Sequence, residues 1–363
     1  SRAEQSRAEQ SRAEQSRAEQ SRAEQSRAEQ SRAEQYLSKT NAQCLKGIFA
    51  IAVLCHHMYQ YSGLFRGKFG IILQALGYLS VGIFFFFTGY GLIVSYQEKK
   101  EFYIKNFLRK RVLPFYLFYL FLTAIYALWR IVLNIEYTRR QLIQSIIFKD
   151  ALAANSWYLQ VIIVFYIFFW ITAKVVKDTK KLVRMIIICS MLYCVGCFML
   201  DVTSTRYESF LCIALGTMWA VNKKRVDKLL DIKGLQLFLL SIILFGVFCS
   251  TYIIVDNLAI QIFSKMASAL AFSSMAIIFV FKLSGRAEVL INNPVTQWLG
   301  KYSLEIYVIQ GIFLLLRKGT KLYIQNPYVF IVVCVIGTLL LAIVIKSVYD
   351  WIVRKCRPQV VNM

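Results

Sequence analysis

The stretch LKGIFAIAVLCHH, residues 45–57, decides what kind of protein this is. An apolar run follows Lys46 and ends on His56 and His57, the only two histidines of the chain. An imidazole at the end of a run long enough to enter a bilayer is costly, so the pair needs a physical reason. Two reasons compete at this point. One is a catalytic base held within the membrane, and the other is a polar side chain hydrogen-bonded to a neighbouring helix.

The rest of the chain continues this pattern. Of its 363 residues, 58% are hydrophobic, a larger share than in ordinary soluble domains. The mean hydropathy is +0.52. Apolar runs of bilayer-spanning length recur almost to the last residue, which predicts an all-α polytopic membrane protein. We expect about ten spans, at residues 45–61, 70–96, 112–134, 157–175, 183–200, 207–222, 235–255, 259–282, 298–316 and 328–352.

The distribution of charge predicts the orientation. The net charge of +23 comes from lysines and arginines clustered in short segments, most densely after the even-numbered spans. Because basic loops stay on the cytoplasmic side, both termini are predicted to be cytoplasmic. A nucleic-acid partner is not expected, since no basic face of a folded soluble domain is available to hold one.

Two features are predicted to carry no chemistry. Residues 1–35 are the pentapeptide SRAEQ repeated seven times, with no apolar side chain larger than alanine to bury. We expect a solvated tail there, disordered or helical, ahead of a membrane-embedded domain over residues 36–363. The nine cysteines lie mostly inside apolar runs. The CxxC of Cys194 and Cys197 has no companion pair or histidine nearby, so packing is favoured and no metal site is predicted.

Helical geometry singles out one histidine. His57 is eleven residues after Lys46, about 16 Å along a helix and close to three turns, so the two side chains share a face. A cation at the inner surface suits an anionic donor such as a phosphate-bearing thioester. Neutral His57 at depth can accept the proton of an attacking hydroxyl, or act as a nucleophile. His56 points about 100° away from that face, which favours a packing role.

Four further stretches each have an ordinary explanation. The cations of residues 109–111 are typical of a basic cluster that sets topology. The phenylalanine run within residues 80–91 lies between small residues, which favours close helix packing. The aromatic pair at residues 157–158 suits an interfacial belt, although such rings also stack on sugars. Glu305 lies one turn from Lys301, and an i,i+4 pair explains it as well as catalysis does.

Taken in this order, the stretches resemble the acyltransferase type 3 family of integral membrane enzymes. The family pattern of Leu-Arg/Lys-Gly, an apolar run and His matches residues 45–57, and its Phe-Phe run with a following Ser-Gly-Phe is similar to residues 84–90. Its Arg and Pro at the start of the third helix match Arg111 and Pro114. The Trp-Tyr-Leu of residues 157–159 and the Gly-Lys-Tyr-Ser-Leu of residues 300–304 fit as well.

This resemblance implies a reaction and its participants. An acyl group, most often acetyl, would pass from cytoplasmic acyl-CoA to a hydroxyl of a cell-surface polysaccharide or a lipid-linked glycan precursor. The expected partners are therefore membrane lipid, the glycan and other proteins of envelope polysaccharide synthesis, in a bacterial cytoplasmic membrane and with no metal. His57 would be catalytic; Lys46, Arg109 and Arg111 would bind the donor; and Trp157, Tyr158 and Glu305 would contact the acceptor.

Three positions depart from the family pattern. Leu108 replaces the first arginine of an Arg-x-x-Arg pair, Gly82 replaces an acidic residue, and Gln310 replaces a histidine that often closes the ninth-span motif. The last two suggest a variant acceptor or a variant arrangement of partners. A transporter or export component without chemistry is the competing class. The two halves show no convincing internal repeat and few mid-span prolines, which favours the enzyme. A sensor or scaffold has only the repeat tail in its favour.

Overall fold

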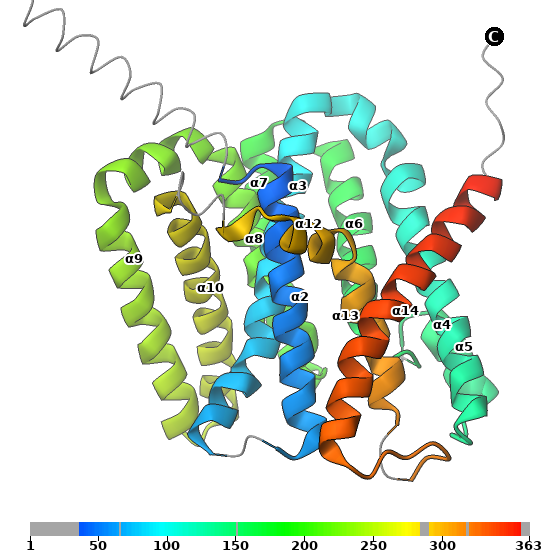
Figure 1. Ribbon diagram of the computed structural model, residues 1–363. Coiled ribbons are helices and arrows are strands. Elements are labelled where there is room, and N and C mark those ends of the chain that lie inside the picture. The colour runs from blue at the N-terminus through cyan, green and yellow to red at the C-terminus, as the bar shows by residue number, and fades with distance from the viewer. Residues whose placement is uncertain (1–35, 65–66, 150–151, 284–289, 317–318, 357–363) are drawn as a thin grey trace, which may run out of the picture.

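The computed structural model describes residues 36–64, 67–149, 152–283, 290–316 and 319–356, and these form a bundle of helices (Figure 1). No strand occurs in these ranges, so the predicted all-α class is confirmed. The predicted tail, residues 1–35, lies outside them. The elements are α2 (Lys39–Ser62), α3 (Lys68–Phe107), the π-helical turn η1 (Leu108–Val112), α4 (Leu113–Val132), α5 (Arg139–Ile146), α6 (Trp157–Val175), α7 (Thr179–Met199), the 3₁₀ turn η2 (Ser204–Arg206), α8 (Leu211–Val221), α9 (Lys223–Ile254), α10 (Leu258–Lys282), α12 (Pro294–Lys301), α13 (Ser303–Leu314) and α14 (Pro327–Cys356).

Six helical segments of the described chain are long and apolar enough to cross a membrane. They are the continuous element at residues 69–132, then α6, α7, α9, α10 and α14. Each of the ten predicted spans falls on helix, but the number ten stays a prediction. The ninth predicted span is divided at Tyr302 between α12 and α13, and α13 has only 12 residues.

Two basic segments predicted as loops are helical instead. The cations of residues 99–111 continue α3 into η1, and those of residues 223–233 form the first turns of α9. Neither segment contains glycine or proline, and lysine and arginine favour helix, so nothing in either segment stops it. The chain bends within α3 at Lys100, whose φ of 45° is left-handed.

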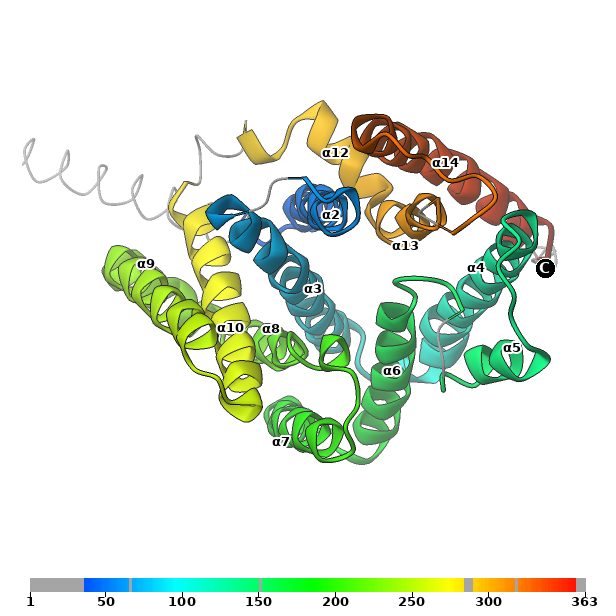
Figure 2. The same ribbon diagram turned by 90° about the horizontal axis from the view of Figure 1, so that it is seen from below.

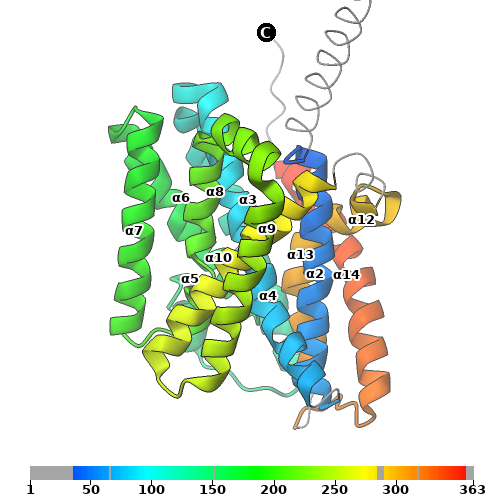
Figure 3. The same ribbon diagram turned by 90° about the vertical axis from the view of Figure 1, so that its left-hand side faces the viewer.

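The helices surround α2 and α3 (Figure 2). α2 packs against α3, α12 and α13, α8 packs along α3, and α9 pairs with α10 at one edge. The start of α2 and the end of α14 lie at the same end of the bundle, called the terminal end below (Figures 1 and 3). The opposite end, where Ser62 closes α2, is called the far end.

Two glycines allow α3 and α8 to approach closely. A Cβ on Gly89 would overlap the Ile213 carbonyl oxygen, and a Cβ on Gly216 would overlap the Phe86 carbonyl oxygen. Small residues at helix interfaces permit this backbone contact in membrane proteins. The small residues around the phenylalanine run therefore have the predicted packing role.

The first described residue anchors the chain. The buried Tyr36 hydroxyl donates to Asp227 at 2.7 Å and accepts from the Trp219 indole at 2.9 Å. Burial raises the pKa of this hydroxyl, so it stays protonated as a donor. Asp227 also pairs with Lys223 at 2.6 Å. These contacts bind the start of the membrane domain to α8 and α9.

Candidate active site

A cavity of about 560 Å³ lies between α2, α3 and α6 toward the terminal end. Its lining includes three cations, Lys39, Lys46 and Arg111. The two lysines lie in α2, and Arg111 follows more than 60 residues later in the chain. We call this space the α2–α3 cavity. α2 is helical throughout residues 39–62, so the face that carries Lys39 and Lys46 is continuous. The structure therefore brings two predicted donor residues, Lys46 and Arg111, to one cavity.

The π-helical turn η1 contains both Arg109 and Arg111, but only one of them lines the cavity. Both side chains are exposed, but Arg111 lines the α2–α3 cavity and Arg109 is not among the residues that line it. Single π-turns change the direction of side chains within a helix and occur often at functional sites. The run of three cations does not act as one cluster, because its members face different surroundings.

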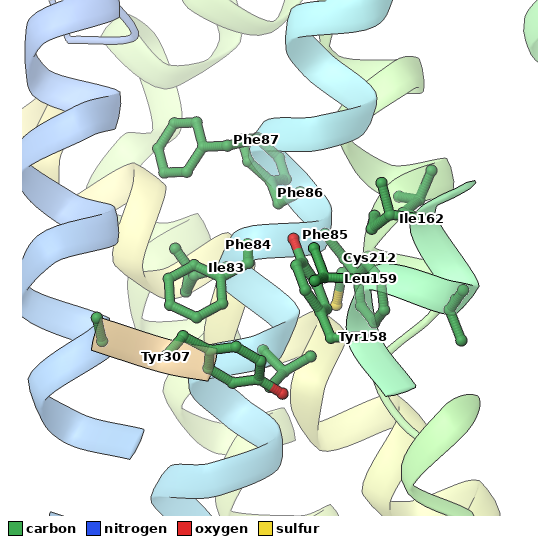
Figure 4. Packing of buried hydrophobic residues seen from close by; sticks show 14 of the residues in the cluster. Ile83, Phe84, Phe85, Phe86, Phe87, Tyr158, Leu159, Ile162, Cys212 and Tyr307 are labelled. Atoms are coloured by element: carbon green, nitrogen blue, oxygen red, sulfur yellow. The ribbon is translucent and has the colours of Figure 1, made fainter. Parts of the chain in front are cut away.

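Aromatic rings close the inner end of the cavity (Figure 4). Phe84 of α3 lies with its ring centroid 6.1 Å from that of Tyr158 and 5.7 Å from that of Tyr307. The two tyrosine rings are 5.3 Å apart. All three side chains are at least nine-tenths buried. The phenylalanine run, the Trp-Tyr-Leu stretch and the ninth-span stretch thus meet at one point.

His57 of α2 lies beside α13 at Gln310, which is one helical turn after Tyr307. Its Nδ1 is 3.0 Å from Oε1 of Gln310, a residue 253 positions later in the chain. Gln310 is fully buried, and its Nε2 donates to the Tyr307 carbonyl oxygen at 2.8 Å. The same chain segment therefore closes the cavity and holds the histidine.

The Gln310 amide sets which nitrogen of His57 carries the proton. A backbone carbonyl only accepts, so the amide nitrogen must face Tyr307 and the amide oxygen must face His57. The oxygen in turn requires a hydrogen on Nδ1. Nε2 of neutral His57 is then left with its lone pair, which is the form that acts as a base or a nucleophile.

His56 has a different environment. Its Nδ1 donates to the Leu73 carbonyl oxygen at 3.0 Å, and its ring lies where a Cβ on Gly77 would be, 2.6 Å from Nε2. The side chain is buried against α3. The structure thus agrees with the packing role predicted for His56.

A second depression lies at the far end, beside His57. It has a volume of about 540 Å³ and is lined by Tyr59, Gln60, Tyr61, Gly63, Leu64 and Gln74. The ring of Tyr61 is 6.5 Å from that of His57. This polar and aromatic surface was missed in the sequence, although Tyr59 and Tyr61 follow the histidines directly and could have been noticed there.

The predicted acceptor residues do not meet at one place. Tyr158 lines the α2–α3 cavity, while Trp157 is not among its lining residues. Glu305 is buried and pairs with Lys346 of α14 at 3.3 Å, so the partner expected from helix spacing, Lys301, was the wrong one. Lys301 is exposed, with its ammonium 5.2 Å from the Tyr302 ring centroid.

Comparison with known proteins identifies the class. The family model for the acyltransferase domain Acyl_transf_3 matches residues 40–347. No match was found among curated proteins or among solved structures. A helical membrane protein whose domain matches over this length is a membrane acyltransferase. The chain belongs to the acyltransferase 3 family, and the resemblance of its motifs is confirmed.

Proposed function

We propose that this protein moves an acyl group, most simply acetyl, from cytoplasmic acyl-CoA to a hydroxyl of a cell-surface polysaccharide or a lipid-linked glycan precursor. One observation carries the proposal. A cationic cavity on one side ends at Tyr307, and Gln310, one turn further along α13, holds His57 with Nε2 free. The residue that ends the donor cavity, Tyr307, and the residue that orients the base, Gln310, are therefore one turn apart on α13.

The donor suits the α2–α3 cavity. Its volume is within the range of small-molecule sites, and its walls are mostly apolar with a few charged groups. Lys39, Lys46 and Arg111 would bind the phosphates of acyl-CoA through charge-assisted hydrogen bonds. Arg109, which is exposed and does not line the cavity, would meet only the part of the donor that extends beyond it.

The acceptor would approach from the far end. The depression beside Tyr61 offers aromatic rings and amide groups, which stack on and hydrogen-bond to sugars. The predicted acceptor contacts of Trp157 and Glu305 stay predictions, and both residues lie outside this depression.

The reaction follows from the state of His57. Nε2 accepts the proton of the acceptor hydroxyl while the hydroxyl oxygen attacks the carbonyl carbon of the thioester. The carbon–sulfur bond then breaks, and the thiolate leaves and takes up the proton from the imidazolium. The products are the glycan ester and the free thiol. Phe84, Tyr158 and Tyr307 are buried rings that line the cavity, and Tyr307 is one turn of α13 before Gln310, so the acyl group would have to pass these rings to reach His57.

Radiolabelled acetyl-CoA tests the proposal. Membranes that contain the protein should transfer label to glycan, and membranes with His57→Ala should not. Lys174→Gln is a matched control, because Lys174 is an exposed cation over the Trp170 ring, away from the cavity. Equal labelling with His57→Ala would exclude the catalytic role. Intact glycan export without any labelling would favour a transporter.

A further inference from the structure

A second cavity, between α6 and α7, has no place in the reaction above. It has a volume of about 410 Å³ and is walled almost entirely by apolar side chains. On α6 it extends from Gln160 to Phe168, and on α7 from Cys189 to Cys197. Each wall spans nine residues of helix, a rise of about 12 Å from the first to the last. We call this cavity the α6–α7 slot.

The slot reaches from the buried side of α6 and α7 to the outer surface of the bundle at Val164. α7 packs chiefly on α8 and only weakly on α6, and the two helices stand at the edge of the bundle (Figure 2). Val164 in the α6 wall is 49% exposed, and Cys189 in the α7 wall is partly exposed. The floor is aromatic, with the Phe210 ring 5.9 Å from Phe165 and 4.4 Å from Tyr193. An apolar chain from the lipid can enter such a slot sideways.

One cation lies at the far end of the slot. Arg206, the last residue of η2, lines it and is half-buried. Its acidic neighbour in sequence, Glu208, pairs with Lys265 at 3.2 Å. Among the residues that the structure describes, Arg206 itself forms no ion pair. A guanidinium at the end of an apolar slot matches a phosphate attached to a hydrocarbon chain.

We propose that the α6–α7 slot binds an anionic phospholipid from the leaflet at the far end, with one acyl chain between α6 and α7 and the phosphate on Arg206. The length of the slot matches this occupant, since it covers less than half of a hydrocarbon core of about 30 Å and so belongs to a single leaflet. The lipid would fill the space that the weak contact between α6 and α7 leaves open. The proposal does not depend on the acyl-transfer chemistry.

A photoreactive phosphatidylglycerol, with a diazirine in its acyl chain, provides the test. The full-length protein is irradiated in bilayers, and the cross-linked residues are located by mass spectrometry. We expect labelling within residues 160–168 and 189–197 to exceed labelling of the lipid-exposed helices α9 and α14 several-fold. A diacylglycerol probe with the same chain but no phosphate should lack this preference.

Variants separate the head group from the chain. Arg206→Gln should lower labelling of the slot about tenfold, as loss of a hydrogen bond between charged groups predicts. Arg184→Gln, at an exposed arginine near the start of α7 and thus at the terminal end, should not lower it. Val164→Trp should block the slot, and its half-exposed position allows the protein to fold.

Three results would overturn the proposal. Uniform labelling of α6, α7, α9 and α14 would show a general lipid contact, and equal labelling by the neutral probe would show that Arg206 holds no phosphate. A bismaleimide cross-link from Cys189 to another polypeptide in native membranes would show that a protein, a second copy included, covers the slot instead.

Discussion

Gly47 and Gly300 lie in direct backbone contact. A Cβ on Gly47 would overlap the Gly300 amide nitrogen, and a Cβ on Gly300 would overlap the Gln43 carbonyl oxygen. The two glycines belong to the first-span and ninth-span motifs, so α12 can cross α2 only because both lack a side chain. This contact positions α13, which follows α12 after one residue and carries Tyr307 and Gln310.

Gly300→Ala should therefore destabilise the protein. Overpacking a tight contact costs about 1–3 kcal/mol, because backbone must move to accommodate the methyl group. Thermal unfolding followed by tryptophan fluorescence in detergent would measure the loss. Gly246→Ala on α9 is the control, since nothing lies within 4 Å of its added Cβ. Equal melting temperatures for both variants would contradict the close contact.

Gln310→Leu should lower turnover with little effect on donor binding. Without the amide, Nδ1 of His57 loses the acceptor that selects its tautomer, while the residues of the α2–α3 cavity are unchanged. We expect kcat to fall on the order of 10- to 100-fold, a part of the contribution of a general base. The KM for acyl-CoA should stay within about twofold.

The split between kcat and KM distinguishes positioning from simple misfolding. Gln310→Glu retains an oxygen that can accept from Nδ1, so it should recover a measurable part of the activity. If the leucine and glutamate variants lost activity equally while both remained folded, Gln310 would not orient His57.

Arg111→Gln and Lys46→Gln should weaken donor binding. Each removes a charge-assisted hydrogen bond to phosphate, which corresponds to an increase in KM for acyl-CoA of about 10-fold or more. The effect should diminish at high salt, because screening already weakens these pairs in the unmodified protein. A raised KM for Lys174→Gln as well would show a general charge effect rather than a site.

Glu305 and Lys346 should behave as a structural pair. Lys346→Met leaves the buried Glu305 carboxylate without its partner, and breaking a buried pair costs about 3–5 kcal/mol. Glu305→Gln should cost less, because Lys346 keeps a second carboxylate, that of Asp350, at 3.9 Å. Because Lys346 is partly exposed, we expect the lower part of that range. The double variant should lose less stability than the sum of the two, as a double-mutant cycle of melting curves would measure. Additive losses would leave Glu305 free for the acceptor role that its motif implies.

Deletion of residues 1–35 should leave folding and activity unchanged. The hydrogen bonds that anchor the start of the membrane domain begin at Tyr36, which the deletion retains. Tyr36→Phe should in contrast lower stability by about 1–3 kcal/mol, since Asp227 and Trp219 lose a buried partner. Detergent size-exclusion profiles and melting temperatures would compare the two. Loss of folding on deletion alone would show that the repeat contributes to the membrane domain.

Local sequence patterns were sufficient to predict the apolar helices and to indicate the family. Long apolar runs predict helix wherever they occur, because a bilayer allows the backbone no other partners than its own. α5 was missed, although Thr138 and Gln141 form a capping box that marks its start. The charge of the basic segments in α3 and α9 favours loops, but neither segment contains a helix breaker, and both are helical.

The sequence by itself determined that the chain is a helical membrane protein, that Lys46 and His57 share one face of α2, and that its motifs are those of an acyltransferase. Only the tertiary structure decided that Gln310 holds His57, that Arg111 rather than Arg109 enters the α2–α3 cavity, and that Glu305 pairs with Lys346. Periodicity specifies which face of a helix a residue occupies. It does not specify how helices far apart in the chain rotate and cross, because packing contacts such as the backbone contact of Gly47 with Gly300 set those angles.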